Sequence, residues 1–191
     1  NSTFTSHYGD LTAHQNTMLF LKNSTANMNG AGTDIDITVP DKAATSDSFA
    51  GVYVEGTSTL NGVKKITVGE NSNGIYMNKA VNFISSAKDI ESTKDGAKAL
   101  LGEDSSFTNR SKITLSGKES VGIYAKDSNV TQSGTGTNGI YVDKESSAGI
   151  FSEITLTTTV TPNVTIADAD KTVTNTGYIN ISGENSAGIF G

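Results

Sequence analysis

Apolar and polar residues alternate over short stretches of this chain, in a pattern that repeats. In the stretches 109–124 and 175–190, Ile113 with Leu115 and Ile179 with Ile181 are separated by single polar residues. Alternation with a period of two is typical of a β-strand that buries one face. In both stretches a glycine, a few polar residues and a second short apolar run follow. The pattern therefore predicts two short strands joined by a tight polar corner.

Three windows of this kind align nearly end to end: NGVKKITVGENSNGIY at 61–76, NRSKITLSGKESVGIY at 109–124 and NTGYINISGENSAGIF at 175–190. Their spacing divides into units of about 22 to 24 residues, a period typical of solenoids. A unit of this length has room for three short strands. We therefore predict an all-β chain that folds as a right-handed parallel β-helix, with three strands per turn and with loop or short-helix excursions. A β-sandwich is the alternative, but it does not explain corners that are nearly identical.

The corners share a Gly-Ile-aromatic motif, found for example at 74–76 and 122–124. Further glycines follow the first strand of each window, at positions 69, 117 and 183. Glycine suits a bend that needs a positive φ or a close approach of the backbone. The Asn and Ser residues beside these glycines can bond to neighbouring backbone groups. We interpret the motif as an architectural corner rather than as a repeated binding site.

The composition is consistent with an extended β protein. The chain has 191 residues, 35% of them hydrophobic, with 20 Gly, no Cys and a net charge of −6. Without Cys there is no disulfide framework and no thiolate metal site. The acidic balance, with 14 unclustered Lys and Arg, argues against nucleic-acid binding, and no apolar stretch approaches the length that spans a bilayer. The chain stops within the repeat, so we expect residues 1–191 to be one β-helical segment of a longer chain.

The sequences SGKESVGIYAKDSNVTQSG and NTGYINISGENSAGIFG resemble the passenger repeats of Gram-negative type V autotransporters, in particular the very large fusobacterial outer-membrane adhesins. The resemblance covers residues 48–84 and 109–191. It implies a β-helical passenger domain secreted to the bacterial cell surface. It also implies attachment to the outer membrane through a C-terminal translocator barrel, which nothing in this sequence resembles. Because the motif is a repeat signature, the resemblance says little about a ligand.

Two segments depart from the repeat, residues 86–104 and 152–174, and we expect both to be excursions from the solenoid. The first has apolar residues at roughly helical spacing, with Ser86 and Asp89 placed as a capping box, which favours a short helix; an irregular turn of the solenoid is the alternative. We expect its removal to leave the β-structure intact. Because insertions in solenoids often carry binding, we predict a partner interface in the first segment. Its residues are Lys88, Ile90, Glu91, Lys94, Leu100 and Leu101.

Outward-facing aromatic residues form a second candidate site. If Ile75, Met77 and Ile123 point into the core, the rings beside them point outward, and strands about 4.8 Å apart bring rings of one register into a column. The rings predicted to face outward are Tyr53, Tyr76, Tyr124, Tyr141, Phe151 and Phe190, with Tyr141 and Phe151 on different faces. Such a column suits a sugar ring or a protein partner. The favoured alternative is that the rings stack on one another or lie under residues 86–104.

We predict no catalytic, cofactor or metal site. The two histidines, His7 and His14, lie outside the clear repeats, so no Ser-His-Asp triad can form within them. The clustered acids of β-helical polysaccharide enzymes are not evident either. The acidic pairs Asp34 with Asp36 and Asp168 with Asp170 are expected to be solvated, and calcium binding is left open.

The leading hypothesis is a non-catalytic surface adhesin segment that binds a host-cell protein or glycan, or the surface of other bacteria. A β-helical carbohydrate-active enzyme and a purely structural stalk are the alternatives. An ice-binding solenoid is disfavoured, because the Thr-x-Thr pattern of TLTTT at 155–159 is not repeated over many successive turns.

Overall fold

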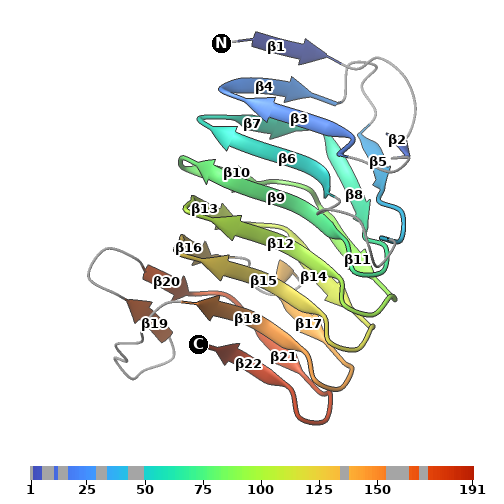
Figure 1. The fold of residues 1–191 in the computed structure, drawn as a ribbon, viewed down its shortest axis with the longest axis vertical. Coiled ribbons are helices and arrows are strands. Elements are labelled where there is room, and N and C mark those ends of the chain that lie inside the picture. The colour runs from blue at the N-terminus through green and yellow to red at the C-terminus, as the bar shows by residue number, and fades with distance from the viewer. Residues whose placement is uncertain are drawn as a thin grey trace.

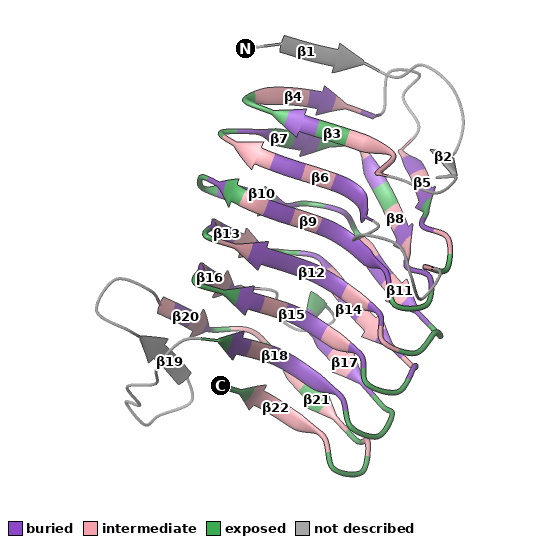
Figure 2. Cartoon of the chain, in the orientation of Figure 1, coloured by how far each residue is buried: buried purple, intermediate pink, exposed green. Residues whose placement is uncertain are grey.

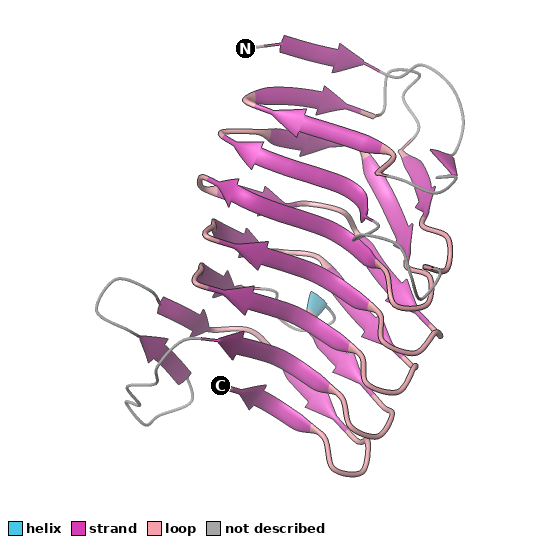
Figure 3. Ribbon diagram, in the orientation of Figure 1, coloured by secondary structure: helices cyan, strands magenta, loops and turns pink. Residues whose placement is uncertain are grey.

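The chain winds along one axis as a stack of turns, each made of short β-strands (Figure 1). No α-helix occurs among the residues described, and nearly all of the regular structure is strand (Figure 3). Side chains of residues 2–5, 11–12 and 164–167 are not described, only their backbone. The computed structural model describes residues 2–5, 11–12, 17–28, 34–42, 50–133, 138–153, 164–167 and 172–191.

The strands form three faces, which we name sheets 1, 2 and 3 in the order in which each turn visits them. Sheet 1 consists of β3 (Leu19–Lys22), β6 (Ala50–Gly56), β9 (Asn73–Ala80), β12 (Lys98–Glu103), β15 (Val121–Lys126), β18 (Ala148–Glu153) and β22 (Ala187–Phe190). Sheet 2 consists of β1 (Ser2–Thr5), β4 (Ser24–Asn27) and β7 (Thr59–Asn61), then β10 (Phe83–Ser85), β13 (Ser106–Asn109), β16 (Asn129–Gln132), β20 (Thr172–Asn175) and β19 (Val164–Ala167). Sheet 3 consists of β2 (Leu11–Thr12), β5 (Ile35–Thr38), β8 (Val63–Thr67), β11 (Asp89–Ser92), β14 (Lys112–Leu115), β17 (Ile140–Val142) and β21 (Ile179–Ile181).

The strands within sheets 1 and 3 pair in parallel, with equivalent residues of successive turns opposite each other. In sheet 1, for example, Ile75 lies opposite Leu100, and Leu100 lies opposite Ile123. Hydrogen-bond partners on adjacent turns are 23, 25 or 27 residues apart in the central part of the chain. Parallel pairing between turns rules out the β-sandwich, whose sheets are antiparallel. The predicted right-handed parallel β-helix is confirmed (Figure 1).

The core is a stack of apolar side chains that all three sheets contribute. Figure 2 shows buried residues, in purple, along the strands of each sheet. Ile75, Met77 and Ile123 of sheet 1 are fully buried, as the alternation predicts. Sheet 2 adds the large rings of Phe83 and Phe107. Burying one such side chain stabilises the fold by roughly 1.5 to 3 kcal/mol, so the stack accounts for much of the stability of each turn. Sheet 3 adds a column of buried isoleucines, Ile37, Ile66, Ile90, Ile113 and Ile140.

Residues 86–104 form a regular turn of the solenoid, so the expectation of a helix or an excursion there is wrong. They supply β11 and β12, and each of these strands pairs in register with the turn before it and the turn after it. Ala87, Ile90, Ala97 and Leu100 all point into the core. Two short strands and the corner between them bury residues that are 3 or 7 positions apart in this segment. Residues on one face of a helix have the same spacing, which explains the helical pattern.

The corner between sheets 3 and 1 uses one left-handed residue on each turn. Asn71, Glu119 and Asn185 have φ values of 51°, 54° and 54°, and Gly96 takes the same place with a φ of 64°. The positive φ does not fall on the glycines at 69, 117 and 183, so of the two roles that the sequence allows for them only the close approach of the backbone is found. Asn tolerates this conformation better than most residues, and Gly adopts it without strain.

The glycines beside the left-handed residue are required by close packing between turns. A Cβ at Gly117 would lie 1.8 Å from the carbonyl oxygen of Lys94 on the preceding turn. In the Gly-Ile-aromatic motif, a Cβ at Gly122 would lie 2.6 Å from the carbonyl oxygen of Gly149 and 2.8 Å from a methyl group of Ile140. The motif therefore marks a place where the backbones of two turns and a core side chain converge, which supports its interpretation as an architectural corner.

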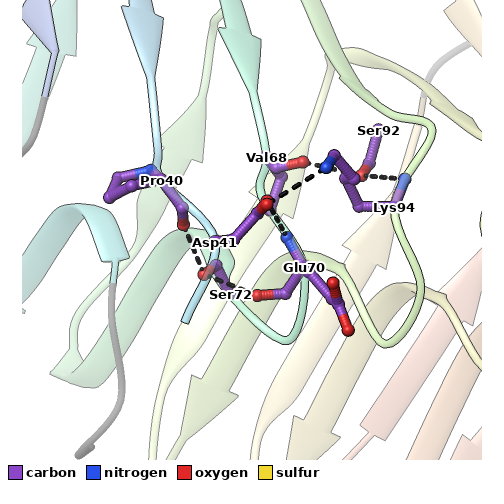
Figure 4. A network of polar contacts seen from close by, with 7 residues as sticks. All are labelled: Pro40, Asp41, Val68, Glu70, Ser72, Ser92 and Lys94. Atoms are coloured by element: carbon purple, nitrogen blue, oxygen red, sulfur yellow. Dashed lines mark hydrogen bonds and ion pairs between the residues drawn. The ribbon is translucent and has the colours of Figure 1, made fainter. Parts of the chain in front are cut away.

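Polar side chains join each corner to the next (Figure 4). The hydroxyl of Ser72 donates to the carbonyl oxygen of Pro40 over 2.8 Å. The carboxylate of Asp41 accepts a hydrogen bond from the backbone N–H of Glu70 (2.8 Å) and one from the ammonium group of Lys94 (3.0 Å). These bonds lower the pKa of Asp41 below its ordinary value, the bond from Glu70 most of all. The serine-to-carbonyl bond recurs on later turns from Ser120 to Lys94, from Ser147 to Gly117 and from Ser186 to Lys144.

Sheet 2 is interrupted between β7 and β10, which belong to consecutive turns but to separate ladders. One side chain bridges the interruption, because the hydroxyl of Ser86 donates to the carbonyl oxygen of Leu60 over 2.7 Å. A hollow of about 270 Å³ lies beside it, with Ile84 and Arg110 in its lining. Sheets 1 and 3 continue across the same two turns.

The second expected excursion, 152–174, lies partly outside the described residues. Its described part includes β19, which pairs with β20 in the antiparallel sense. β19 occupies the edge of β20 that faces away from β16, and so departs from the parallel winding of the other turns.

Candidate functional site

Sheet 1 carries a column of large outward side chains that crosses all seven of its strands. The outward orientation predicted for the five rings of this sheet is confirmed, since each of them is partly or largely exposed. Tyr141 lies on sheet 3, as its separation from Phe151 predicts. Cross-strand pairing aligns Phe20, Tyr53, Tyr76, Leu101, Tyr124, Phe151 and Phe190, which we name the aromatic column.

Most neighbouring rings of the column stack face to face. The ring centroids of Tyr124 and Phe151 are 5.0 Å apart, with 15° between the planes, and those of Phe151 and Phe190 are 5.2 Å apart, with 20°. Phe20 stacks on Tyr53 in the same way, and Tyr76 meets Tyr53 edge to face. The rings therefore pack on one another, as the favoured alternative predicts. Residues 86–104 do not cover them, because that segment is itself a turn of the solenoid.

Leu101 divides the column into two ladders of three rings. It lies opposite Tyr76 on one side and Tyr124 on the other, and only 8% of its surface is exposed. The outer ends of the two ladders are open, since Phe20 and Phe190 are 58% and 55% exposed. Because stacking occupies the ring faces within each ladder, the column presents mainly ring edges to solvent.

Charged side chains lie beside the aromatic column, and two of them accept hydrogen bonds from tyrosine hydroxyl groups. The Tyr76 hydroxyl donates to Glu103 over 2.5 Å, and the Tyr124 hydroxyl donates to Glu153 on the following turn. Burial, followed by the nearby carboxylate, raises the pKa of Tyr76, and the same two causes raise the pKa of Tyr124 to about 12. These hydroxyls are therefore committed to contacts within the protein.

Tyr124 should ionise at a higher pH in the parent protein than in the Glu153→Gln variant. A raised pKa means that the folded protein holds this proton more tightly than the unfolded chain does. The stabilisation is complete well below about pH 10, the pKa of an unfolded tyrosine, and is lost as the pH rises through the folded pKa. Phenolate absorbance as a function of pH measures the difference, with Glu55→Gln as the control. Identical curves for parent and Glu153→Gln would show that the hydroxyl and carboxylate do not interact.

A groove of about 350 Å³ lies on the other side of the column, along its second ladder. Val121, Ala148 and Ala187 form its floor, on successive strands of sheet 1. Lys98 lies at one end, opposite Val121, with its ammonium nitrogen 6.0 Å from the centre of the Tyr124 ring. The remaining lining residues are Tyr124, Phe151 and Phe190 on one side and Ser146, Ser147 and Asn185 on the other.

The partner interface predicted for residues 88–101 does not exist as a single surface. Ile90 and Leu100 are fully buried in the core, so neither can anchor a partner. Lys88 and Glu91 are on or beside sheet 3, where they pair with Asp34 (2.6 Å) and Lys65 (3.0 Å). Lys94 lies in the corner network, and Leu101 lies in the aromatic column.

Phe20 and Lys98 are site residues that the sequence pattern does not reveal. Phe20 precedes the clear repeats, and its register becomes visible only through the pairing of β3 with β6. Lys98 falls in the segment whose spacing suggests a helix, which hides its place on sheet 1. Lys98 occupies the same position in the repeat as Val121 and Ala148, and an alignment of these positions would have placed Lys98 on sheet 1.

Among the described side chains, no group of three or more His, Asp or Glu residues is arranged to hold a metal ion. Asp34 is paired with Lys88. His7, His14, Asp168 and Asp170 lie outside the described residues, and so does the stretch TLTTT.

The fold and the site together define a class of protein, a parallel β-helix with an aromatic column on one face. Comparison with protein-family models, with characterised proteins and with solved structures gave no match. In the part of the chain that the structure describes, no helix is long and apolar enough to cross a membrane.

Proposed function

We propose that this chain is a non-catalytic binding segment of a bacterial surface adhesin of the autotransporter type. Its partner is a protein or glycan on host cells or on other bacteria. The observation that carries the proposal is the aromatic column, a row of large side chains on the seven strands of sheet 1, in which all six rings are partly or largely exposed. Aromatic side chains are enriched at protein interfaces, because they bury much area with few rotatable bonds.

The geometry of the rings favours a protein partner over a stacked sugar. A sugar binds an aromatic residue through the ring face, and here the faces of Tyr124 and Phe151 are in contact with other rings. A protein surface can instead pack its side chains against the row of ring edges. The charged residues beside the column, among them Glu103 and Glu153, form the polar rim that such interfaces commonly have.

The second candidate function is a structural stalk, which the regularity of the turns favours. No observation on the described residues favours the other alternative, a carbohydrate-active enzyme.

Cell binding by the purified segment tests the proposal. A triple variant with Phe20, Phe151 and Phe190 changed to Ser should bind host cells or bacteria at least tenfold more weakly than the parent, because interface hot spots contribute about 2 kcal/mol or more. These three side chains make no hydrogen bonds, so their loss leaves the tyrosine–carboxylate pairs in place.

A matched control removes exposed apolar side chains elsewhere. Val81, Ile84 and Tyr178 are 48%, 41% and 48% exposed, and their change to Ser should leave cell binding unchanged. Equal loss in both triple variants would indicate non-specific hydrophobic adhesion. No binding by the folded parent would favour the structural stalk.

A further inference from the structure

The groove beside the aromatic column follows the solenoid axis. Its floor residues occupy successive strands, and strands are spaced about 4.8 Å apart, so the distance from Lys98 to Ala187 is about 14 Å. Val121 and Ala148 contribute aliphatic side chains, and Tyr124 and Phe151 border one side. The result is a largely apolar groove with a cation at one end.

Lys98 differs from the lysines that form ion pairs elsewhere on the surface. Each of those has a carboxylate within 3.0 Å, whereas Lys98 has none among the described residues. Lys98 is more than half buried, and both this burial and the charge of Lys42 lower its pKa. A carboxylate from a ligand would supply the missing counter-charge. The paired lysines are Lys22, Lys65, Lys88, Lys94 and Lys118.

The walls of the groove provide few hydrogen-bonding groups for a polar ligand. The Ser147 hydroxyl accepts a bond from the backbone N–H of Ser120 (3.1 Å) and donates to the carbonyl oxygen of Glu145 (3.2 Å). The other polar side chains, Ser146 and Asn185, lie at corners along one rim. A peptide backbone or a sugar in the groove would lose water without gaining partners, which costs free energy for every unmatched group. An alkyl chain carries no such groups.

We propose that this groove binds a medium-chain fatty acid, with the carboxylate paired to Lys98 and the alkyl chain on the floor formed by Val121, Ala148 and Ala187. The volume of the groove, about 350 Å³, lies in the range of small-molecule sites, which typically combine apolar walls with one or two charged groups. The groove shares Tyr124, Phe151 and Phe190 with the aromatic column. Ligand binding and cell binding are measured separately, so either proposal can fail without the other.

Titration calorimetry of the purified segment with decanoate, below the concentration at which it forms micelles, tests the proposal. Binding should be saturable with one site. Affinity should rise about fourfold per methylene from hexanoate to decanoate, as each buried methylene contributes its transfer free energy. Lys98→Met should weaken decanoate binding at least tenfold, as expected for loss of a charge-assisted bond, and should leave decanol binding unchanged. Lys98→Arg, which keeps the charge, should retain binding.

The matched control is Lys112→Met on sheet 3, because Lys112 lies 5.9 Å from the Tyr141 ring in an arrangement similar to that of Lys98. It should bind decanoate as the parent does. Ala187→Leu, which fills the floor at a half-buried position, should abolish binding while the melting temperature stays close to that of the parent. The proposal is wrong if the parent shows no saturable binding, if Lys98→Met binds as tightly as the parent, or if Lys112→Met loses as much affinity.

Discussion

Replacing Ile123 by Asp should lower the free energy of unfolding by about 4 kcal/mol, enough to unfold the central turns at moderate temperature. Ile123 is fully buried and lies between Leu100 and Ile150 in the core of sheet 1. A carboxylate at this place finds neither water nor a cation. It must stay charged in an apolar environment or take up a proton, and both cost free energy. Urea unfolding followed by circular dichroism measures the change.

Thr131→Asp provides the control for this substitution. Thr131 is on sheet 2, points outward, and has Thr108 and Thr174 as its neighbours across the sheet. The new carboxylate there remains in water, so the loss should be about 1 kcal/mol or less, the span of strand propensities. Equal midpoints for the two variants would contradict the assignment of inward and outward residues.

Deleting residues 86–104 should abolish the fold, whereas deleting residues 75–99 should leave a shorter solenoid. The first deletion joins the end of β10 directly to the start of β13. These strands are parallel neighbours in sheet 2, and a parallel pair needs a crossover of a dozen residues or more. The second deletion joins Gly74 to Leu100, which occupies the place of Ile75 one turn later. It therefore removes one complete turn in phase.

Circular dichroism, thermal melting and size-exclusion chromatography distinguish the two deletions. The in-phase variant should keep the β signal and a cooperative transition. Its free energy of unfolding should fall by about the contribution of one repeat and one interface between repeats, as in other solenoids. The out-of-phase variant should show neither. A folded, cooperative 86–104 deletion would mean that this segment is an excursion after all.

The fold is readable from the sequence because the repeat and the alternation point to the same structure. Ile75 and Ile123 are buried where a period of two places them, and the rings beside them face outward. Residues 86–104 mislead because local spacing alone cannot separate a helix from two strands and a corner. Gly96 is the useful signal there, since glycine is unfavourable within a helix but suits a left-handed corner.

The candidate site is less predictable than the fold, because it depends on which turns lie side by side. Phe20 joins the column across a turn that is longer than the central ones, so no fixed period finds it. The groove depends on the small size of Ala148 and Ala187 as much as on the rings, and small residues leave little trace in a sequence pattern. That Lys98 has no carboxylate beside it among the described residues is a property of the assembled surface alone.

The interruption of sheet 2 has a mechanical consequence. A rod built from three continuous ladders resists bending about equally on every side, but between β7 and β10 one of the three ladders is missing. The ladder of β6 and β9 on sheet 1 also shifts its register within the same pair of turns. Tension along the axis is therefore carried at this level by two ladders and by isolated bonds at the third face, such as those from Ser86 to Leu60 and from Val81 to Gly56. The solenoid should therefore be least stiff between β7 and β10. When the chain is pulled or bent, we expect the turns to separate there first, on the side of sheet 2.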